Sequence, residues 1–66
     1  MQIILNGQPQ EITAGLTVQK LVTKLGLENT AIVAEHNENI LQKEDWDKIN
    51  LKENDKIELI KFCGGG

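Results

Sequence analysis

The hydrophobic and polar positions of the chain change period along the sequence, and these changes mark the expected elements. Residues 3–5 are β-branched or bulky apolar residues that run into Asn6-Gly7, a dipeptide that accepts the positive φ values of a tight hairpin turn. Pro9 restricts the exit of that turn, and residues 10–13 then alternate polar and apolar side chains, as in a return strand with one face in water. The N-terminal stretch therefore predicts an antiparallel hairpin.

One helix is expected after this hairpin. Thr17 is a candidate N-cap, and Gly26 is a candidate stop that takes the left-handed conformation after the last turn. Between them, apolar residues recur at the i, i+3, i+4, i+7 spacing of one helical face, and these are Val18, Leu21, Val22 and Leu25. We expect this face to be buried against the rest of the domain.

The middle of the chain contains shorter apolar runs. Residues 31–34 are apolar and lead into a polar turn at 35–39, and a brief apolar pair follows at 40–41, which predicts a strand, a turn and a short strand. The charged stretch 43–48 surrounds Trp46 and suits a helical turn, with Trp46 packed on the core.

The clearest late strand runs from residue 56 to residue 62. Because side chains alternate along a strand, one face carries Ile57 and Leu59, and the other carries Glu58, Ile60 and Phe62. Both faces cannot belong to one core layer if the sheet is covered on one side only. We expect Ile60 and Phe62 to form a partner-docking surface, with Glu58 among the acidic groups that steer the encounter. The alternative is that Ile60 or Phe62 folds over the sheet edge.

The order of these elements predicts an α+β roll. One helix crosses one face of a mixed sheet of four to five strands, and the last strand pairs in parallel with the first. The expected domain covers residues 1–61, and residues 62–66 form a flexible C-terminal tail that ends in three glycines.

Composition excludes several functional classes. A chain of 66 residues is at most one domain and is too small for a deep substrate pocket beside a core, which argues against an autonomous enzyme. Seven Lys and no Arg against ten Asp and Glu give a net charge of -3, which argues against nucleic acid binding. No apolar run approaches the roughly 18 residues of a membrane span, and no targeting segment is recognisable. We therefore expect a cytoplasmic protein with no membrane partner.

Two side chains with reactive chemistry have plainer explanations. Cys63 is the single cysteine, so it forms no internal disulfide, and with no neighbouring His or Arg to lower its thiol pKa it is interpreted as a spacer and not a sulfur relay. His36 lies between Glu35 and Glu38, but no second His is present at metal-ligand spacing. We interpret it as a solvated turn histidine and expect no metal site.

Five short motifs carry a family resemblance over the whole chain. They are Leu5-Asn6-Gly7, Thr17-Val18-x-x-Leu21-Val22-x-x-Leu25, Val33-Ala34-Glu35-x-Asn37-x-x-Ile40-Leu41, Asn54-Asp55-x-Ile57-Glu58-x-Ile60 and Phe62-x-Gly64-Gly65-Gly66. In this order and at this length they resemble the ThiS family, ubiquitin-like β-grasp sulfur carriers of thiamine biosynthesis. The chain departs from the family at Asn54, where glycine is common, and at Cys63, where an aliphatic residue is usual.

The resemblance implies that the chemistry lies at the C-terminus. In such carriers an E1-like adenylyltransferase, ThiF, uses ATP and Mg²⁺ to adenylate the terminal carboxylate, here that of Gly66. A sulfur donor such as a cysteine desulfurase then leads to a thiocarboxylate, and thiazole synthase, ThiG, receives the sulfur. Gly64 and Gly65 would thread into both partner sites because glycine has no Cβ to obstruct a narrow channel.

The resemblance also implies that the carrier is a protein co-substrate and not an enzyme, and that it binds no cofactor of its own. Two alternatives stay open. The first is the small subunit of molybdopterin synthase, which uses the same tail chemistry. The second is a ubiquitin-like modifier or a β-grasp binding module with an inert tail.

Overall fold

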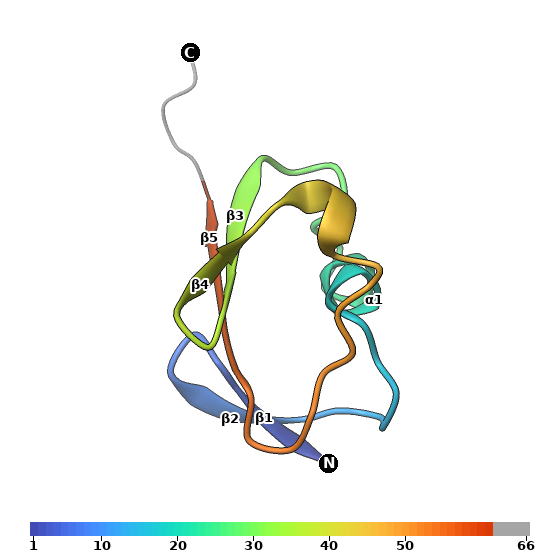
Figure 1. Cartoon of the computed structure of the whole chain (residues 1–66), viewed down its shortest axis with the longest axis vertical. Helices are drawn as coiled ribbons and strands as arrows, with labels where there is room; N and C mark the ends of the chain where they lie inside the picture. Colours follow the sequence, from blue (N-terminus) through green and yellow to red (C-terminus); the bar gives the residue numbers. More distant parts are fainter. Residues whose placement is uncertain (62–66) are drawn as a thin grey trace.

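The computed structural model describes residues 1–61 and contains five strands, one α-helix and one 3₁₀ turn within that range (Figure 1). In chain order these elements are β1 (Gln2–Leu5), β2 (Gln8–Glu11), α1 (Val18–Lys24), β3 (Ile32–His36), β4 (Asn39–Leu41), η1 (Lys43–Asp45) and β5 (Lys56–Lys61). The predicted α+β class and the predicted single helix are confirmed.

The five strands form one mixed sheet in the order β2-β1-β5-β3-β4. The central strand β5 pairs in parallel with β1 and antiparallel with β3, so the first and last strands of the described chain are neighbours, as predicted. Figure 1 shows α1 on one side of this sheet, while no element of residues 1–61 covers the other side. This arrangement is the α+β roll expected from the order of elements, and it agrees with the β-grasp fold that the family resemblance implies.

The N-terminal hairpin is tighter than predicted. Asn6 and Gly7 have φ values of 49° and 82°, which suit a two-residue type I′ turn, and Leu5 pairs directly with Gln8. The return strand therefore begins at Gln8, two residues before the predicted start at residue 10, and it contains Pro9. An edge strand tolerates proline because its outer side has no strand that needs a hydrogen bond donor.

The ends of α1 follow the predicted capping residues. The Thr17 Oγ1 accepts a hydrogen bond from the Lys20 N–H at 3.1 Å. At the other end Gly26 has a φ of 75°, and the Leu27 N–H donates to the Val22 carbonyl at 3.0 Å, which closes the helix with a Schellman motif. The helix is short because its start signal, Thr17, and its stop signal, Gly26, lie only nine positions apart in the sequence.

The prediction that Leu25 is buried is wrong. Leu25 is the C-cap of α1, and its side chain is 43% exposed. The Schellman motif reverses the chain after Leu25, and Leu27 packs against the core in its place. The helical spacing identified the buried face correctly for Val18, Leu21 and Val22, but the helix ends before that face reaches Leu25.

The core lies between α1 and one face of the sheet. Its buried members come from the helix, from three strands and from the loops, and they are Ile3, Ile12, Val18, Leu21, Val22, Ala34, Trp46, Leu51, Ile57 and Leu59. Trp46 is 3% exposed, which confirms that it packs on the core. The inward side chains of Ile57 and Leu59 anchor β5 in this core. The outward side chains of Glu58 and Ile60 are not part of the core.

Candidate functional site

The two faces of β5 differ as the sequence predicts. Ile57 and Leu59 are 0% and 9% exposed and point toward α1, whereas Glu58 is exposed and Ile60 is 46% exposed on the opposite face. The register between β3 and β5 places Val33 directly opposite Ile60. An isoleucine with nearly half its surface in water at the end of a central strand marks a candidate docking surface.

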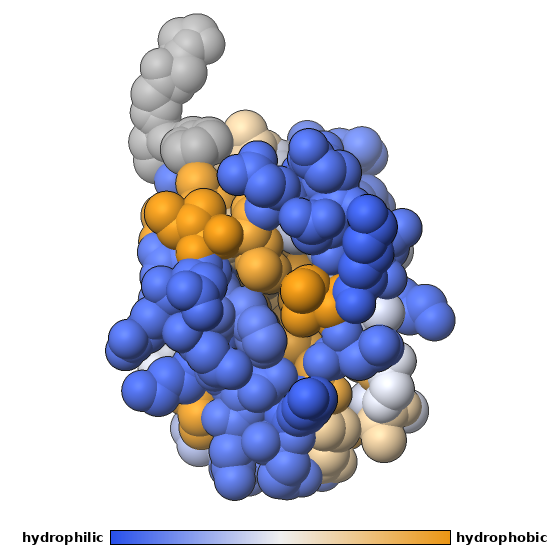
Figure 2. Space-filling view, in the orientation of Figure 1, coloured by the Kyte–Doolittle hydropathy of each residue, from blue (hydrophilic) through white to orange (hydrophobic). Residues whose placement is uncertain are grey.

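A second exposed apolar residue extends this surface. Ile40 on β4 is 67% exposed and pairs with Glu35, so it lies on the same outer face as Ile60 and Val33. Figure 2 shows hydrophobic surface gathered over the upper part of β4 and β5 and mostly hydrophilic surface below it. We call Ile60, Val33 and Ile40 the outer apolar patch. Sequence reasoning missed Ile40 and Val33, although their alternation with Leu41 and Ala34 carried the signal.

Carboxylates gather below the outer apolar patch. Glu35 on β3 lies directly opposite Glu58 on β5, a pairing of like charges that weakens a sheet. Together with Glu38, Lys56 and the apolar side chain of Ile4 they line a shallow hollow of about 290 Å³ beside Gly7. Three carboxylates against one ammonium group leave this part of the outer face acidic, so the predicted acidic steering group Glu58 has acidic neighbours.

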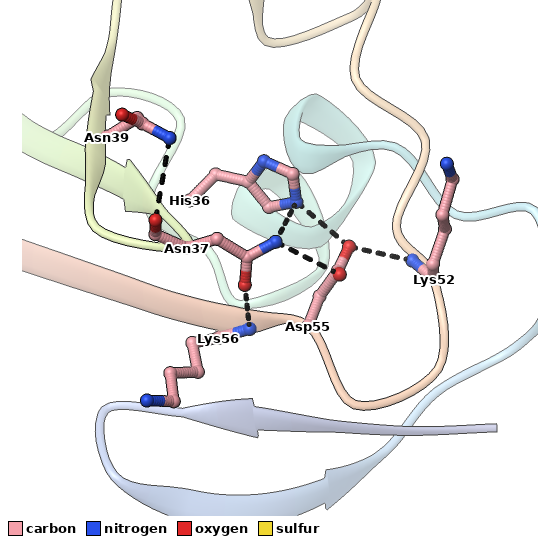
Figure 3. A network of polar contacts seen from close by, with 6 residues as sticks. All are labelled: His36, Asn37, Asn39, Lys52, Asp55 and Lys56. Atoms are coloured by element: carbon pink, nitrogen blue, oxygen red, sulfur yellow. Dashed lines mark hydrogen bonds and ion pairs between the residues drawn. The ribbon is translucent and has the colours of Figure 1, made fainter.

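The opposite end of β5 is fixed by a polar network, shown in Figure 3. The carboxylate of Asp55, just before the strand, lies 2.9 Å from the His36 Nε2, and its oxygens also accept the Asn37 side-chain N–H at 3.2 Å and the Lys52 backbone N–H at 2.9 Å. The Asn37 side chain in turn accepts the Lys56 backbone N–H at 2.9 Å. The network joins the β3–β4 turn to the loop that leads into β5.

The interpretation of His36 as a solvated turn histidine is wrong. Its side chain is 22% exposed, and it is bonded to Asp55, itself 8% exposed. Asp55 is 19 residues away in sequence, so no local pattern could indicate the pair. Burial by itself would raise the pKa of Asp55, but the hydrogen bonds from His36, Lys52 and Asn37, together with the attraction of His36, outweigh it and hold that pKa below its ordinary value of 3.8.

The described residues offer no metal site and no membrane-spanning helix. Within residues 1–61, no group of three or more His, Cys, Asp or Glu side chains is placed to hold a metal ion. In the same part of the chain, no helix is long and apolar enough to cross a membrane.

The remaining predicted site residues lie outside the described residues. These are Phe62, the spacer Cys63, and the glycines Gly64, Gly65 and Gly66. Their predicted roles in docking, threading and modification stay predictions, as does the division of the chain at residue 61. The structure brings Glu58 and Ile60 to one face of the last described strand, which leads into these residues.

Comparison with known proteins gives matches over the whole chain. The model of the ThiS family matches residues 3–66. The crystal structure of the thiamine biosynthesis protein ThiS from Geobacter metallireducens superposes with a TM-score of 0.86 at 29% identity and covers 100% of both chains. The sulfur carrier protein ThiS of Bacillus subtilis is 38% identical over 50 residues, which are 76% of each chain.

A longer relative contains a segment similar to the whole of this chain. The thiazole synthase of Paramagnetospirillum magneticum is 30% identical over 66 residues, which are 100% of this chain and 20% of that protein. The chain therefore spans about a fifth of the length of this curated relative.

Proposed function

Because this chain belongs to the ThiS family, we propose that it is a sulfur carrier for thiazole formation in thiamine biosynthesis, and that it is itself a co-substrate and not an enzyme. The observation that carries the proposal is that the family match runs to residue 66 and thus includes the three final glycines. The reacting group is the carboxylate of Gly66, and Gly64 and Gly65 are the residues that enter the partner sites.

The terminal carboxylate needs activation before it can accept sulfur. With a pKa of about 3.3 to 3.7 it is ionised at neutral pH and is a poor electrophile. ThiF, with ATP and Mg²⁺, forms a bond between a carboxylate oxygen and the α-phosphorus, and pyrophosphate leaves. A sulfur nucleophile then attacks the acyl carbon, the bond to AMP breaks, and a carbon–sulfur bond replaces it. With a persulfide donor, such as that of a cysteine desulfurase, a thiol must also supply two electrons to break the sulfur–sulfur bond.

The outer face of β5 supports this proposal as the docking surface for ThiF and ThiG. The outer apolar patch offers apolar area that α1 does not cover, and Ile60 lies two residues before Phe62 in the sequence. The acidic groups Glu35 and Glu58 favour a partner surface that carries basic side chains, which would raise the rate of encounter at low salt. A partner that holds this face would leave the residues after Lys61 free to reach its active site.

Thiazole synthase is favoured as the final acceptor by the longer relative. In the Paramagnetospirillum magneticum protein, a segment similar to this chain is part of a polypeptide named thiazole synthase. This association supports delivery of sulfur to thiazole and not to molybdopterin, although both deliveries would use the same tail chemistry.

Removal of Gly65 and Gly66 tests the proposal. The truncated chain should lose ThiF-dependent ATP–pyrophosphate exchange by about 100-fold or more, because the new terminus no longer reaches the site, while its Tm changes by only a few degrees. A length-matched control with Gly65→Ala and Gly66→Ala keeps the carboxylate at the same distance and should retain part of the activity. Undiminished exchange by the truncated chain would overturn the proposal.

A further inference from the structure

The side chain of Asn6 makes a long-range contact that its role in the hairpin turn does not require. With a φ of 49° it is the first residue of the two-residue turn between β1 and β2. Its Oδ1 accepts the backbone N–H of Leu59 on β5 at 2.8 Å, across 53 residues of sequence. A hairpin turn alone needs only a residue that tolerates the left-handed conformation, which glycine does as well as asparagine.

This contact takes the place of a rung of the parallel ladder between β1 and β5. The Ile4 N–H donates to the Asp55 carbonyl and the Asn6 N–H donates to the Ile57 carbonyl, both at 2.8 Å. In a regular parallel ladder the next donor, the Leu59 N–H, would bond to the main-chain carbonyl of Asn6. Because the chain turns away at Asn6, the side-chain carbonyl accepts this bond instead. The side-chain amide of Asn6 therefore continues the hydrogen bonding to β5 one step beyond the end of β1.

The contact lies at the last point where β5 is held from both sides. Beyond Leu59, the described part of β5 pairs only with β3, through Ile60 opposite Val33 and Lys61 opposite Ile32. Leu59 itself is 9% exposed, so its position is fixed by the core on one side and by Asn6 along the strand edge. In the described structure, the Asn6 bond is thus the last contact that supports β5 on its β1 side.

We propose that Asn6 is a positioning residue for carrier activation, whose side-chain bond to Leu59 preorganises the end of β5 for docking. The assignment rests on the proposed function. Without the bond, the end of the strand samples other directions, and the partner must order Ile60 and Lys61 when it binds. Preorganisation lowers the free energy lost on binding, so the effect falls on the KM for the carrier and not on kcat.

Two substitutions at Asn6 separate the side-chain bond from the turn. Asn6→Gly keeps the left-handed turn but removes the acceptor, and Asn6→Asp keeps both. With ThiF, ATP and Mg²⁺, we expect Asn6→Gly to raise the KM for the carrier about three- to tenfold, as for the loss of one hydrogen bond, with kcat within about twofold. Asn6→Asp should have a KM close to that of the unsubstituted chain.

Thr17→Ala serves as a control for stability. It removes the N-cap of α1, away from the end of β5, and should lower the Tm by an amount similar to Asn6→Gly. Its KM should stay within about twofold of the unsubstituted chain. An equal rise of the KM in Thr17→Ala, or an unchanged KM in Asn6→Gly, would overturn the assignment.

Amide hydrogen exchange gives a second readout that needs no activity. The Leu59 amide should exchange faster in Asn6→Gly than in Asn6→Asp or in Thr17→Ala, and equal rates in all three would contradict the assignment. If the unsubstituted chain itself is not activated by ThiF while the Leu59 amide responds as expected, the proposed function fails and the positioning role fails with it. If the unsubstituted chain is activated by ThiF but Asn6→Gly has an unchanged KM, only the positioning role of Asn6 fails, and the proposed function stands.

Discussion

The two ends of β5 are built in opposite ways. At the start of the strand, Asp55 is 8% exposed, and His36, Asn37 and the Lys52 backbone all lie within hydrogen bond distance of its carboxylate. At the other end, Ile60 is 46% exposed, and β5 is paired there only with β3 in the described structure. One end is fixed by polar contacts from distant parts of the chain, and the other presents apolar side chains to water.

The difference indicates where stability and function lie. The network at the start of β5 joins the β3–β4 turn to the last loop, so it holds together segments that are far apart in sequence. The apolar residue at the other end is left on the surface, although its burial would stabilise the fold. The two ends therefore divide two tasks: the buried start stabilises the fold, and the exposed end offers apolar contact area to a partner.

The largest expected effect comes from breaking the network at the start of β5. Asp55→Ala leaves the Lys52 backbone N–H and the Asn37 side chain without their acceptor, which should cost about 2 to 3 kcal/mol in the free energy of unfolding. Urea unfolding measures this loss, and the isosteric Asp55→Asn should lose less. The folded fraction should still be activated by ThiF with an ordinary KM. A loss of activation larger than the unfolded fraction explains would contradict the contrast between the two ends.

An opposite pattern is expected at the end of β5. Ile60→Asp should raise the KM for ThiF-dependent activation about tenfold, because it removes apolar contact area from the centre of the docking surface. Its free energy of unfolding should fall by about 1 kcal/mol or less, as for other half-exposed positions. Leu25→Asp is a matched control, because Leu25 is 43% exposed but lies at the end of α1. Equal effects of both substitutions on KM would remove Ile60 from the docking surface.

The smallest effect is a pH dependence of stability that Asp55 contributes. Since the folded-state pKa of Asp55 is lowered below its ordinary value of 3.8, the carboxylate adds stability above that value and loses it as the pH falls through the folded-state pKa. Stability should therefore decline below about pH 4, and the decline should be less steep in Asp55→Asn. Urea unfolding from about pH 6 to about pH 2 measures the two slopes. Parallel curves for the two chains would show that the network does not depend on the charge of Asp55.

Most of the fold could be predicted from the sequence because its signals are local. The Asn6-Gly7 turn, the Thr17 cap and the Gly26 stop each act on residues within a few positions, and all three adopt the predicted conformations. Alternation along β5 separated the buried Ile57 from the exposed Ile60 for the same reason. Leu25 was assigned to the buried face because helical spacing alone does not include the chain reversal after the helix.

The features that could not be predicted depend on segments that meet only after folding. His36 and Asp55 are 19 residues apart, Asn6 and Leu59 are 53 residues apart, and each pair is brought together by strand register and not by a local pattern. The outer apolar patch could be predicted only in part, because Ile40 joins Ile60 through the order of the strands in the sheet. The glycines of the proposed site could be identified from composition and family resemblance, because three consecutive residues are recognisable without knowledge of how the strands pair.

The central claim is that Gly66 carries sulfur, and intact mass spectrometry tests it most directly. The unsubstituted chain is incubated with ThiF, ATP, Mg²⁺, a cysteine desulfurase with cysteine, and a thiol reductant. Replacement of one carboxylate oxygen by sulfur should raise the mass by about 16 Da, and fragmentation should locate the gain at Gly66. An unchanged mass, or a gain of this size located at Cys63 or elsewhere in the chain, would contradict the account.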